Sequence, residues 1–260
     1  MTARSRPVPF SICPVAVRLI ERELDMALAG TGAICIWNDV TDEGRDAFYA
    51  WHLHEHIPER VAIPGFLCGR RYIACGTGTA PEFFTLYETV TPAVLTGSDY
   101  LARLNVPTAW TTTVTQAFRN TARALTEVQF SCGPGLGGIL ATIRVAFQDD
   151  AQRTEFTRRS RELLPSLAAL PHITGAHLCL TDLSGSRVQT AETRDRTDIQ
   201  AAPDGVIMIE GCTMRFVEAA AKQCTDALGR ELRQPAVTGL YRLEHLRTSP
   251  QASDQTREPN

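Results

Sequence analysis

Three of the six histidines in this 260-residue chain lie within five positions, at His52, His54 and His56. Glu55 stands between two of them, and Arg60 follows shortly afterwards. Imidazole and carboxylate groups at this spacing can exchange protons or bind a metal ion, and a guanidinium can bind an anion. No other segment of the sequence concentrates so much of this chemistry.

These residues are expected on a helix that runs from about Asp42 to Ile57. On a wheel of about 100° per residue, His52 and His56 share a face with aromatic and aliphatic side chains, whereas His54 points away from it. Pro58 disfavours helical geometry at the residue before it, so we predict that the helix ends there. The wheel therefore separates one solvent-facing histidine from a pair that faces the core.

Glu55 and His56 would then occupy the last turn, where the helix dipole favours cations and His56 could exchange a proton near neutral pH. Arg60 could bind an anion or keep Glu55 ionised. Three interpretations stay open: a structural histidine pair, a metal site of His52, His56 and Glu55, and a proton-transfer or substrate-binding site. The order of these residues is not the HExxH of metalloproteases, and no second cluster adds ligands. We expect neither a metal nor a cofactor.

A tight turn leads from the histidine segment into a strand that carries Arg70, Arg71 and Tyr72. Strand residues alternate between faces, so Arg70 and Tyr72 share one face and Arg71 takes the other. An arginine that faces a cavity would suit a carboxylate or an enolate, whereas pairing with Glu88 is the structural alternative. Trp110 is a further candidate for a pocket wall, with core packing as its alternative.

The elements that must position these residues are predicted in the order β-α-β-β-α-β, and the order occurs twice. In the first half the expected strands are 33–40, 67–75, 83–89 and one that ends near 132, with a second helical region at 92–104. A glycine-rich joint at 132–138 follows. In the second half the expected helices are 150–164 and 214–232, and the last strand is 238–246. The segment 184–204 is polar and is predicted to be a flexible insertion.

This order is that of the ferredoxin-like unit, which leaves one face of its sheet in need of a partner. We predict an N-terminal extension at 1–29, a first unit with the site at 30–132, a degenerate second unit at 133–248 and a disordered tail at 249–260. When Pro64 is aligned with Pro171, the counterparts of His52, His56 and Arg60 are Arg159, Leu163 and Leu167. One functional pocket is therefore expected, in the first half.

Composition excludes several classes of protein. A net charge of −3 and a pI near 6.1 give no footprint for nucleic acid or acidic membranes. No apolar run reaches the roughly 18 residues of a membrane span, and the N-terminus does not read as a signal peptide. The eight cysteines lack zinc-ligand spacing. We expect a cytoplasmic protein with a small-molecule ligand, and no nucleic-acid or membrane partner.

The segment 30–130 resembles the dimeric α+β barrel superfamily, and within it EthD-like and related uncharacterised bacterial proteins. The positions that carry the resemblance are Glu55, His56, Pro58, Arg60, Pro64, Gly65, Phe66, Arg70, Arg71 and Tyr72. The resemblance implies an α+β barrel built from two ferredoxin-like units fused in one chain. Such a chain would be a monomeric pseudo-dimer or a homodimer, with a pocket between sheet and helices for small aromatic or enolisable molecules.

The leading hypothesis is a cofactor-independent enzyme of the isomerase, cyclase or monooxygenase type. In it, His56 or His52 acts as general acid or base and Glu55 orients the imidazole. Arg60, with Arg70 or Arg71, stabilises negative charge. The alternatives are a non-catalytic ligand-binding or stress-associated protein, and a haem-binding protein with a histidine as axial ligand.

Overall fold

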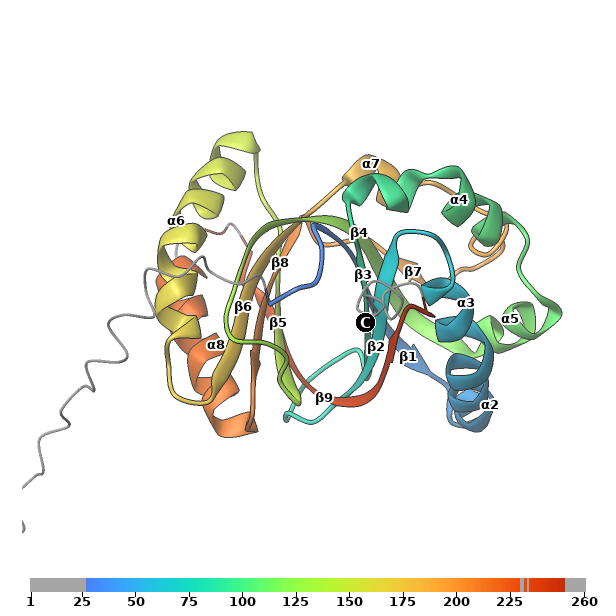
Figure 1. The fold of residues 1–260 in the computed structure, drawn as a ribbon, viewed down its shortest axis with the longest axis horizontal. Coiled ribbons are helices and arrows are strands. Elements are labelled where there is room, and N and C mark those ends of the chain that lie inside the picture. Colours follow the sequence, from blue (N-terminus) through green and yellow to red (C-terminus); the bar gives the residue numbers. More distant parts are fainter. Residues whose placement is uncertain (1–26, 230–231, 233, 251–260) are drawn as a thin grey trace, which may run out of the picture.

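Antiparallel strand pairs follow one another around a closed barrel in the computed structural model, which describes residues 27–229, 232 and 234–250 (Figure 1). The barrel strands of this described part are β1 (Gly32–Val40), β2 (Phe66–Ala74), β3 (Phe83–Thr89), β4 (Phe118–Cys132), β5 (Ile139–Val145), β6 (Ile173–Thr181), β8 (Gly205–Gly211) and β9 (Val237–Thr248). Their order is β1-β3-β2-β9-β5-β8-β6-β4, and β4 pairs back with β1. Of the expected extension at 1–29 and disordered tail at 249–260, residues 1–26 and 251–260 lie outside the described ranges. In the described parts Leu28 and Ser249 are buried, and the N–H of Ser249 donates to the carbonyl of Leu67.

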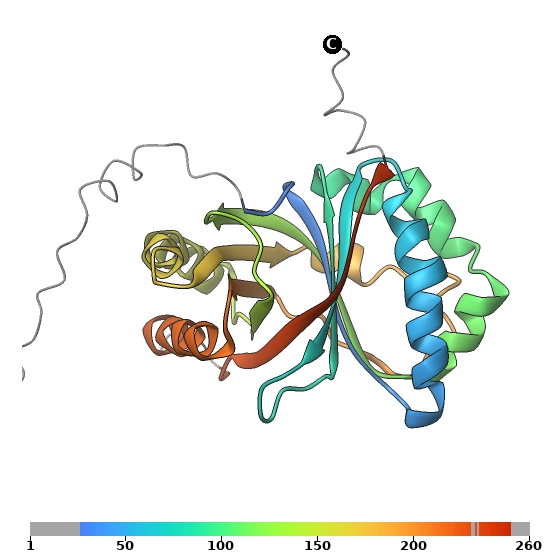
Figure 2. The same ribbon diagram turned by 60° about the horizontal axis from the view of Figure 1, so that its bottom comes forward.

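Helices cover the outside of the barrel on two sides (Figure 2). On one side lie α2 (Arg45–Trp51), η2 (His52–His56) and α3 (Ile57–Val61), together with α4 (Ser98–Asn105) and α5 (Ala109–Val114). On the other side lie α6 (Asp150–Ala168) and α8 (Met214–Leu228). Shorter elements are η1 (Asp42–Gly44), η3 (Pro92–Thr96), η4 (Thr115–Ala117), α7 (Leu183–Ser186) and β7 (Ile199–Gln200). None of the described helices has the length and apolar character that crossing a bilayer requires.

Alternation along β1 shows how the sequence fills both faces of the sheet. Ala33, Cys35 and Trp37 belong to the cluster inside the barrel, whereas Ile34 and Ile36 pack towards the helices. Because both faces are covered, apolar residues occur at nearly every position, as in strands buried on two sides. Burial of each large apolar side chain contributes about 1.5–3 kcal/mol to folding.

The barrel interior also holds a charged cluster. Arg70 on β2 donates to Glu88 on β3, to Glu210 on β8 and to the hydroxyl of Tyr72, and all four side chains are buried. Arg71 takes the outer face, where it pairs with Glu244 at 3.3 Å. The prediction that the two arginines lie on opposite faces is confirmed. Arg70 pairs with Glu88, which was the alternative to a place in a ligand cavity.

The predicted strands agree with the observed ones to within a few residues, whereas several helical segments differ. The predicted helix at 92–104 is broken at Gly97, which is extended, so η3 and α4 are separate. The stretch around Trp110, which was not among the predicted helices, forms α5. The segment 184–204 was expected to be a flexible insertion, but it contains most of α7 and all of β7 and lies against β4 and α4.

The two halves of the chain meet along strand edges. β2 pairs with β9, and β4 pairs with β6, both antiparallel. These two pairings convert eight strands into one closed sheet, so the interior face has no exposed edge. The closed α+β barrel agrees with the predicted fold class. The domain boundaries, the oligomeric state and the cytoplasmic location stay predictions.

Candidate functional site

The histidine segment forms a π-turn inside one continuous helix that runs from Arg45 to Val61. The N–H of Ile57 donates to the carbonyl of His52, a bond across five residues. Pro58 follows at once. It has no N–H and its ring collides with the carbonyl four residues earlier in a normal α-helix. The wider π-turn relieves this collision, which is why the predicted helix end before Pro58 is wrong.

The π-turn changes which side chains face the sheet. Trp51, His52 and His56 are buried, whereas Leu53 is 39% exposed and His54 is exposed as expected. A π-turn carries an extra residue, so the facing of side chains shifts relative to a wheel of about 100° per residue. The prediction that His52 and His56 face inwards and His54 outwards is confirmed.

His52 and His56 stack in an aromatic column. The ring of His52 lies 5.0 Å from Phe48 and 5.5 Å from His56, and the ring of His56 lies 4.1 Å from Trp51. Nδ1 of each imidazole is buried and has no hydrogen-bond partner among the described residues. The ring contacts hold both imidazoles in place and leave Nδ1 of each without a hydrogen bond.

Both histidines are kept neutral at neutral pH. Burial lowers the pKa of His52 and of His56 well below the usual 6.5. The positive charge of Arg71 adds to this effect on the pKa of His52, and that of Arg60 adds to it on the pKa of His56. A neutral imidazole has one ring nitrogen that can accept a proton, so either residue can act as a base.

Glu55 does not hold either imidazole. Its carboxylate accepts hydrogen bonds from Thr108 Oγ1 at 2.5 Å and from Thr111 Oγ1 at 3.3 Å. Thr108 is the N-cap of α5, and Trp51 Nε1 donates to Thr111 Oγ1. Glu55 therefore fastens α5 to the histidine helix. Because that helix continues to Val61, the expected place of Glu55 in its last turn is also wrong.

Arg60 connects the helix to the segment between α7 and β7. It lies in the last turn of α3 and forms a buried ion pair with Glu192. The N–H of Glu192 donates to the carbonyl of Leu104 on α4. Further along, Arg196 donates to Thr121 and Asp198, and β7 pairs with β4. We call residues 183–204 the cover segment, because they close one side of a cavity.

The cavity has a volume of about 560 Å³ and lies between the outer face of the sheet, the histidine helix and the cover segment. The helices contribute Phe48, Trp51, His52, His56, Arg60, Tyr100 and Leu104. The sheet contributes Ile36, Asn38, Thr85, Tyr87, Phe118, Thr121 and Arg123. Its size suits a small organic ligand, and its wall combines aromatic side chains of the helices and the sheet with polar side chains of the cover segment.

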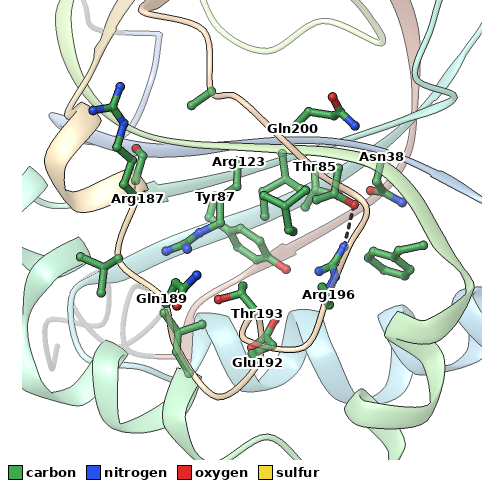
Figure 3. A pocket seen from close by; sticks show the side chains of 18 of the residues that line it. Asn38, Thr85, Tyr87, Arg123, Arg187, Gln189, Glu192, Thr193, Arg196 and Gln200 are labelled. Atoms are coloured by element: carbon green, nitrogen blue, oxygen red, sulfur yellow. Dashed lines mark hydrogen bonds between the residues drawn. The ribbon is translucent and has the colours of Figure 1, made fainter.

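Two further polar groups without partners come from the sheet side. The hydroxyl of Tyr87 and Nε of Arg123 are buried and have no hydrogen bond within the described residues. Figure 3 shows Tyr87 and Arg123 entering the cavity from the sheet, with Glu192 and Thr193 of the cover segment across from them. Burial raises the pKa of Tyr87, so its hydroxyl keeps its proton and can donate a hydrogen bond.

The other predicted site residues lie outside the cavity. Arg70 and Tyr72 are in the barrel interior, and Trp110 is 38% exposed on α5. Arg71 lies beside the histidine column, with its guanidinium 4.5 Å from the ring of Tyr49. The structure thus brings together His52, His56 and Arg60 of the predicted set.

Tyr87, Arg123 and Glu192 were not proposed from the sequence. Tyr87 and Arg123 lie on the two strands that flank β1, and the segments that they face are known only once the barrel is assembled. The sequence signal for Arg123 is a charged residue within a largely buried strand, which needs a partner or a ligand. Nothing in the polar stretch around Glu192 distinguishes that glutamate from its neighbours.

The histidine pair does not fit a metal or a haem iron. Histidines that bind a metal usually donate their other ring N–H to a carboxylate or a carbonyl. Nδ1 of His52 and of His56 has no such partner in the described chain, and Glu55 is bound to threonines. Across the described residues there is also no group of three His, Cys, Asp or Glu side chains that could hold a metal ion.

The sequence matches no protein-family model and no curated protein. Similar solved structures exist at low sequence identity. An anthrone oxidase-like protein has a TM-score of 0.57 at 9% identity, over 87% of this chain and 97% of its own. A monooxygenase-like protein from Lactobacillus acidophilus NCFM has a TM-score of 0.50 at 12% identity, over 84% of this chain and 97% of its own. These similarities show that the ferredoxin-like α+β barrel fold is shared, and they show only that.

Proposed function

We propose that this protein is an enzyme that uses a neutral histidine as general base on a small aromatic or enolisable carbonyl compound, without a bound cofactor. One observation carries the proposal: His52, His56, Tyr87 and Arg123 each present a buried polar atom without a described partner, and all four line one cavity. An unsatisfied buried polar group costs about 1–3 kcal/mol. A bound ligand with complementary groups would remove that cost.

His56 is the better placed of the two bases. Its ring lies 6.3 Å from the ring of Tyr87, and after burial Arg60 is the group that most lowers its pKa. The base takes a proton from a phenol or from a carbon next to a carbonyl, and the electron pair stays on the substrate as a phenolate or an enolate. The Tyr87 hydroxyl donates to the new oxyanion, and the imidazolium is stabilised by the anion beside it.

His52 has a supporting role because its ring stacks on that of His56. It lies between Phe48 and His56 and so fixes the plane of the His56 ring. The anion formed in the cavity can isomerise, cyclise or react with dioxygen, depending on the substrate. The cover segment closes one side of the cavity, which limits the access of water to that anion from this side.

We also propose that the barrel is a pseudo-dimer of two ferredoxin-like units, 30–132 and 133–248, and that the first is EthD-like. The strand orders support the two-unit part, because β4-β1-β3-β2 in the first half corresponds to β9-β5-β8-β6 in the second. Only the first half carries the histidine pair, which supports one site per chain.

The test compares the wild-type protein with His56→Gln and His52→Gln on anthrone, a probe suggested by the anthrone oxidase-like neighbour. Oxygen consumption and product absorbance are measured. We expect His56→Gln to lower kcat/KM by 10²–10⁴-fold, which is the usual range for loss of a general base. The exposed His54→Gln is the matched control and should keep the wild-type rate.

The histidine mechanism is wrong if both buried-histidine variants keep the wild-type rate. Phenols, enolisable ketones and lactones extend the panel beyond anthrone. Binding of these compounds without turnover of any of them would instead identify a non-catalytic ligand-binding protein.

A further inference from the structure

Arg123 places a positive charge in the cavity that no carboxylate in the described chain neutralises. Its guanidinium donates to the hydroxyl of Tyr100 at 3.3 Å and lies 5.8 Å from the centre of that ring. Both contacts are with a neutral group. Nε is buried and has no partner among the described residues. The Arg123 side chain is partly buried, and a guanidinium in a cavity wall without a counter-charge is well suited to bind an anion.

Two other arginines of the cavity wall, Arg60 and Arg196, differ from Arg123 in this respect, whereas Arg187 and Arg194 of the cover segment are exposed. Arg60 is paired with Glu192, and Arg196 is paired with Asp198 at 2.7 Å. Those two guanidiniums are thus already used in holding the cover segment against the helix and the sheet. Arg123 is the cation of the sheet wall that remains available to a ligand.

We propose that Arg123 forms an anion subsite that binds a carboxylate group carried by an aromatic substrate. The planar guanidinium matches the two oxygens of a carboxylate, and Tyr100 holds it in place. Ile36 lies beside Arg123 on the neighbouring strand, and aromatic side chains form other parts of the cavity wall, so the charged group is expected on a ligand with an apolar body. A small inorganic anion would leave the apolar side chains of the cavity wall in contact with water.

The position of Arg123 also orients the ligand. Arg123 lies on β4, directly across β1 from Thr85 through Ile36, whereas His56 lies on the helix that covers the sheet. A carboxylate bound on the sheet wall therefore directs the rest of the ring system towards the histidine column. The inference rests on the proposed function for the reaction at His56, but binding at Arg123 can be measured without turnover.

The experiment measures binding of 2-naphthoate and of its neutral analogue 2-naphthamide by calorimetry. We expect the wild-type protein to bind the carboxylate at least 10-fold more tightly than the amide. Arg123→Met should remove this preference, so that the two dissociation constants agree within about twofold, while binding of the amide is retained. Arg123→Gln serves the same purpose if the Met variant does not fold.

Two control variants separate this inference from the proposed function. Arg215→Met removes an exposed arginine of α8 and should keep the preference for the carboxylate. His56→Gln should also keep it, even though turnover is lost. The subsite is contradicted if the wild-type protein binds neither compound or both equally, or if Arg123→Met keeps the preference. A protein that prefers naphthoate but turns over no substrate retains the subsite and loses only the enzymatic proposal.

Discussion

Arg60 and Glu192 join the histidine helix to the cover segment through a buried ion pair of 2.5 Å. The two residues are far apart in the sequence, and their pairing closes the cavity on the side opposite the sheet. Glu192 belongs to the second half of the chain, whereas the histidines belong to the first. A segment from the second half of the chain, which lacks the histidine pair, thus completes the site.

We predict that Glu192→Gln loosens the cover segment and leaves Arg60 without its counter-charge. Removal of one partner of a buried ion pair costs about 3–5 kcal/mol, so unfolding should occur at lower denaturant concentration. Amide hydrogen exchange in 187–200 should increase, because the segment loses its contact with α3. Ligand affinity should fall with it.

The double variant Arg60→Met, Glu192→Leu provides the matched control. Two apolar side chains can replace a buried ion pair with little loss of stability. We expect its stability to exceed that of Glu192→Gln. If Glu192→Gln instead unfolds and exchanges like the wild type, the ion pair does not hold the segment.

A second prediction concerns Glu55. Glu55→Ala removes the hydrogen bonds to Thr108 and Thr111 and should cost about 1–3 kcal/mol of unfolding free energy. The acid limb of any pH–rate profile should stay in place, because Glu55 does not contact an imidazole. Glu43→Ala, at an exposed site on η1, is the control and should be nearly neutral. A displaced acid limb in Glu55→Ala would return Glu55 to the role of orienting a histidine.

A third prediction follows from the lowered pKa values of His52 and His56. Below pH 6.5 the unfolded chain takes up protons at these two residues that the folded chain resists, so the free energy of unfolding decreases as the pH falls. The stability that they contribute is fully present above pH 6.5. In the double variant His52→Gln, His56→Gln, the melting temperature should decrease less between pH 6.5 and pH 5 than it does in the wild type. His54→Gln should keep the wild-type slope, and an unchanged slope in the double variant would argue against buried neutral imidazoles.

Much of the fold could be predicted from sequence because local patterns determine it. Alternation placed Arg70 and Tyr72 on the face opposite Arg71, and turn residues marked strand ends. The helix was misjudged at Pro58 because a π-turn depends on how the helix packs, and a wheel of fixed angle cannot represent it. Gly97 interrupts the predicted helix at 92–104 because its backbone is extended, and composition alone did not reveal this.

The site was only partly predictable, because its walls come from distant segments. His52, His56 and Arg60 lie close together in sequence, so their spacing was informative. Tyr87 and Arg123 meet them only through the register of β3, β1 and β4. Glu192 lies in the polar cover segment, which packs against α4 through a backbone hydrogen bond. These relationships exist only in the closed barrel.

The last prediction concerns the charged cluster inside the barrel. Arg70 binds Glu88 and Glu210, so Arg70→Met would leave two carboxylates buried without their cation. We expect a loss of about 3–5 kcal/mol in unfolding free energy. The triple variant Arg70→Met, Glu88→Gln, Glu210→Gln removes both negative charges as well and should recover part of that loss. Arg242→Met, at an exposed site on β9, should have little effect.

The same cluster predicts a distinct response to acid. Burial by itself would raise the pKa of Glu210, but Arg70, His177 and the N–H of Gly137 lower it to about 2. Because this pKa lies below the ordinary 4.5, Glu210 stabilises the wild-type fold above pH 4.5, and that contribution is lost as the pH falls towards 2. Arg70→Met should therefore lose less stability than the wild type over this range. Equal acid dependence in the two proteins would show that Arg70 does not determine the ionisation of Glu210.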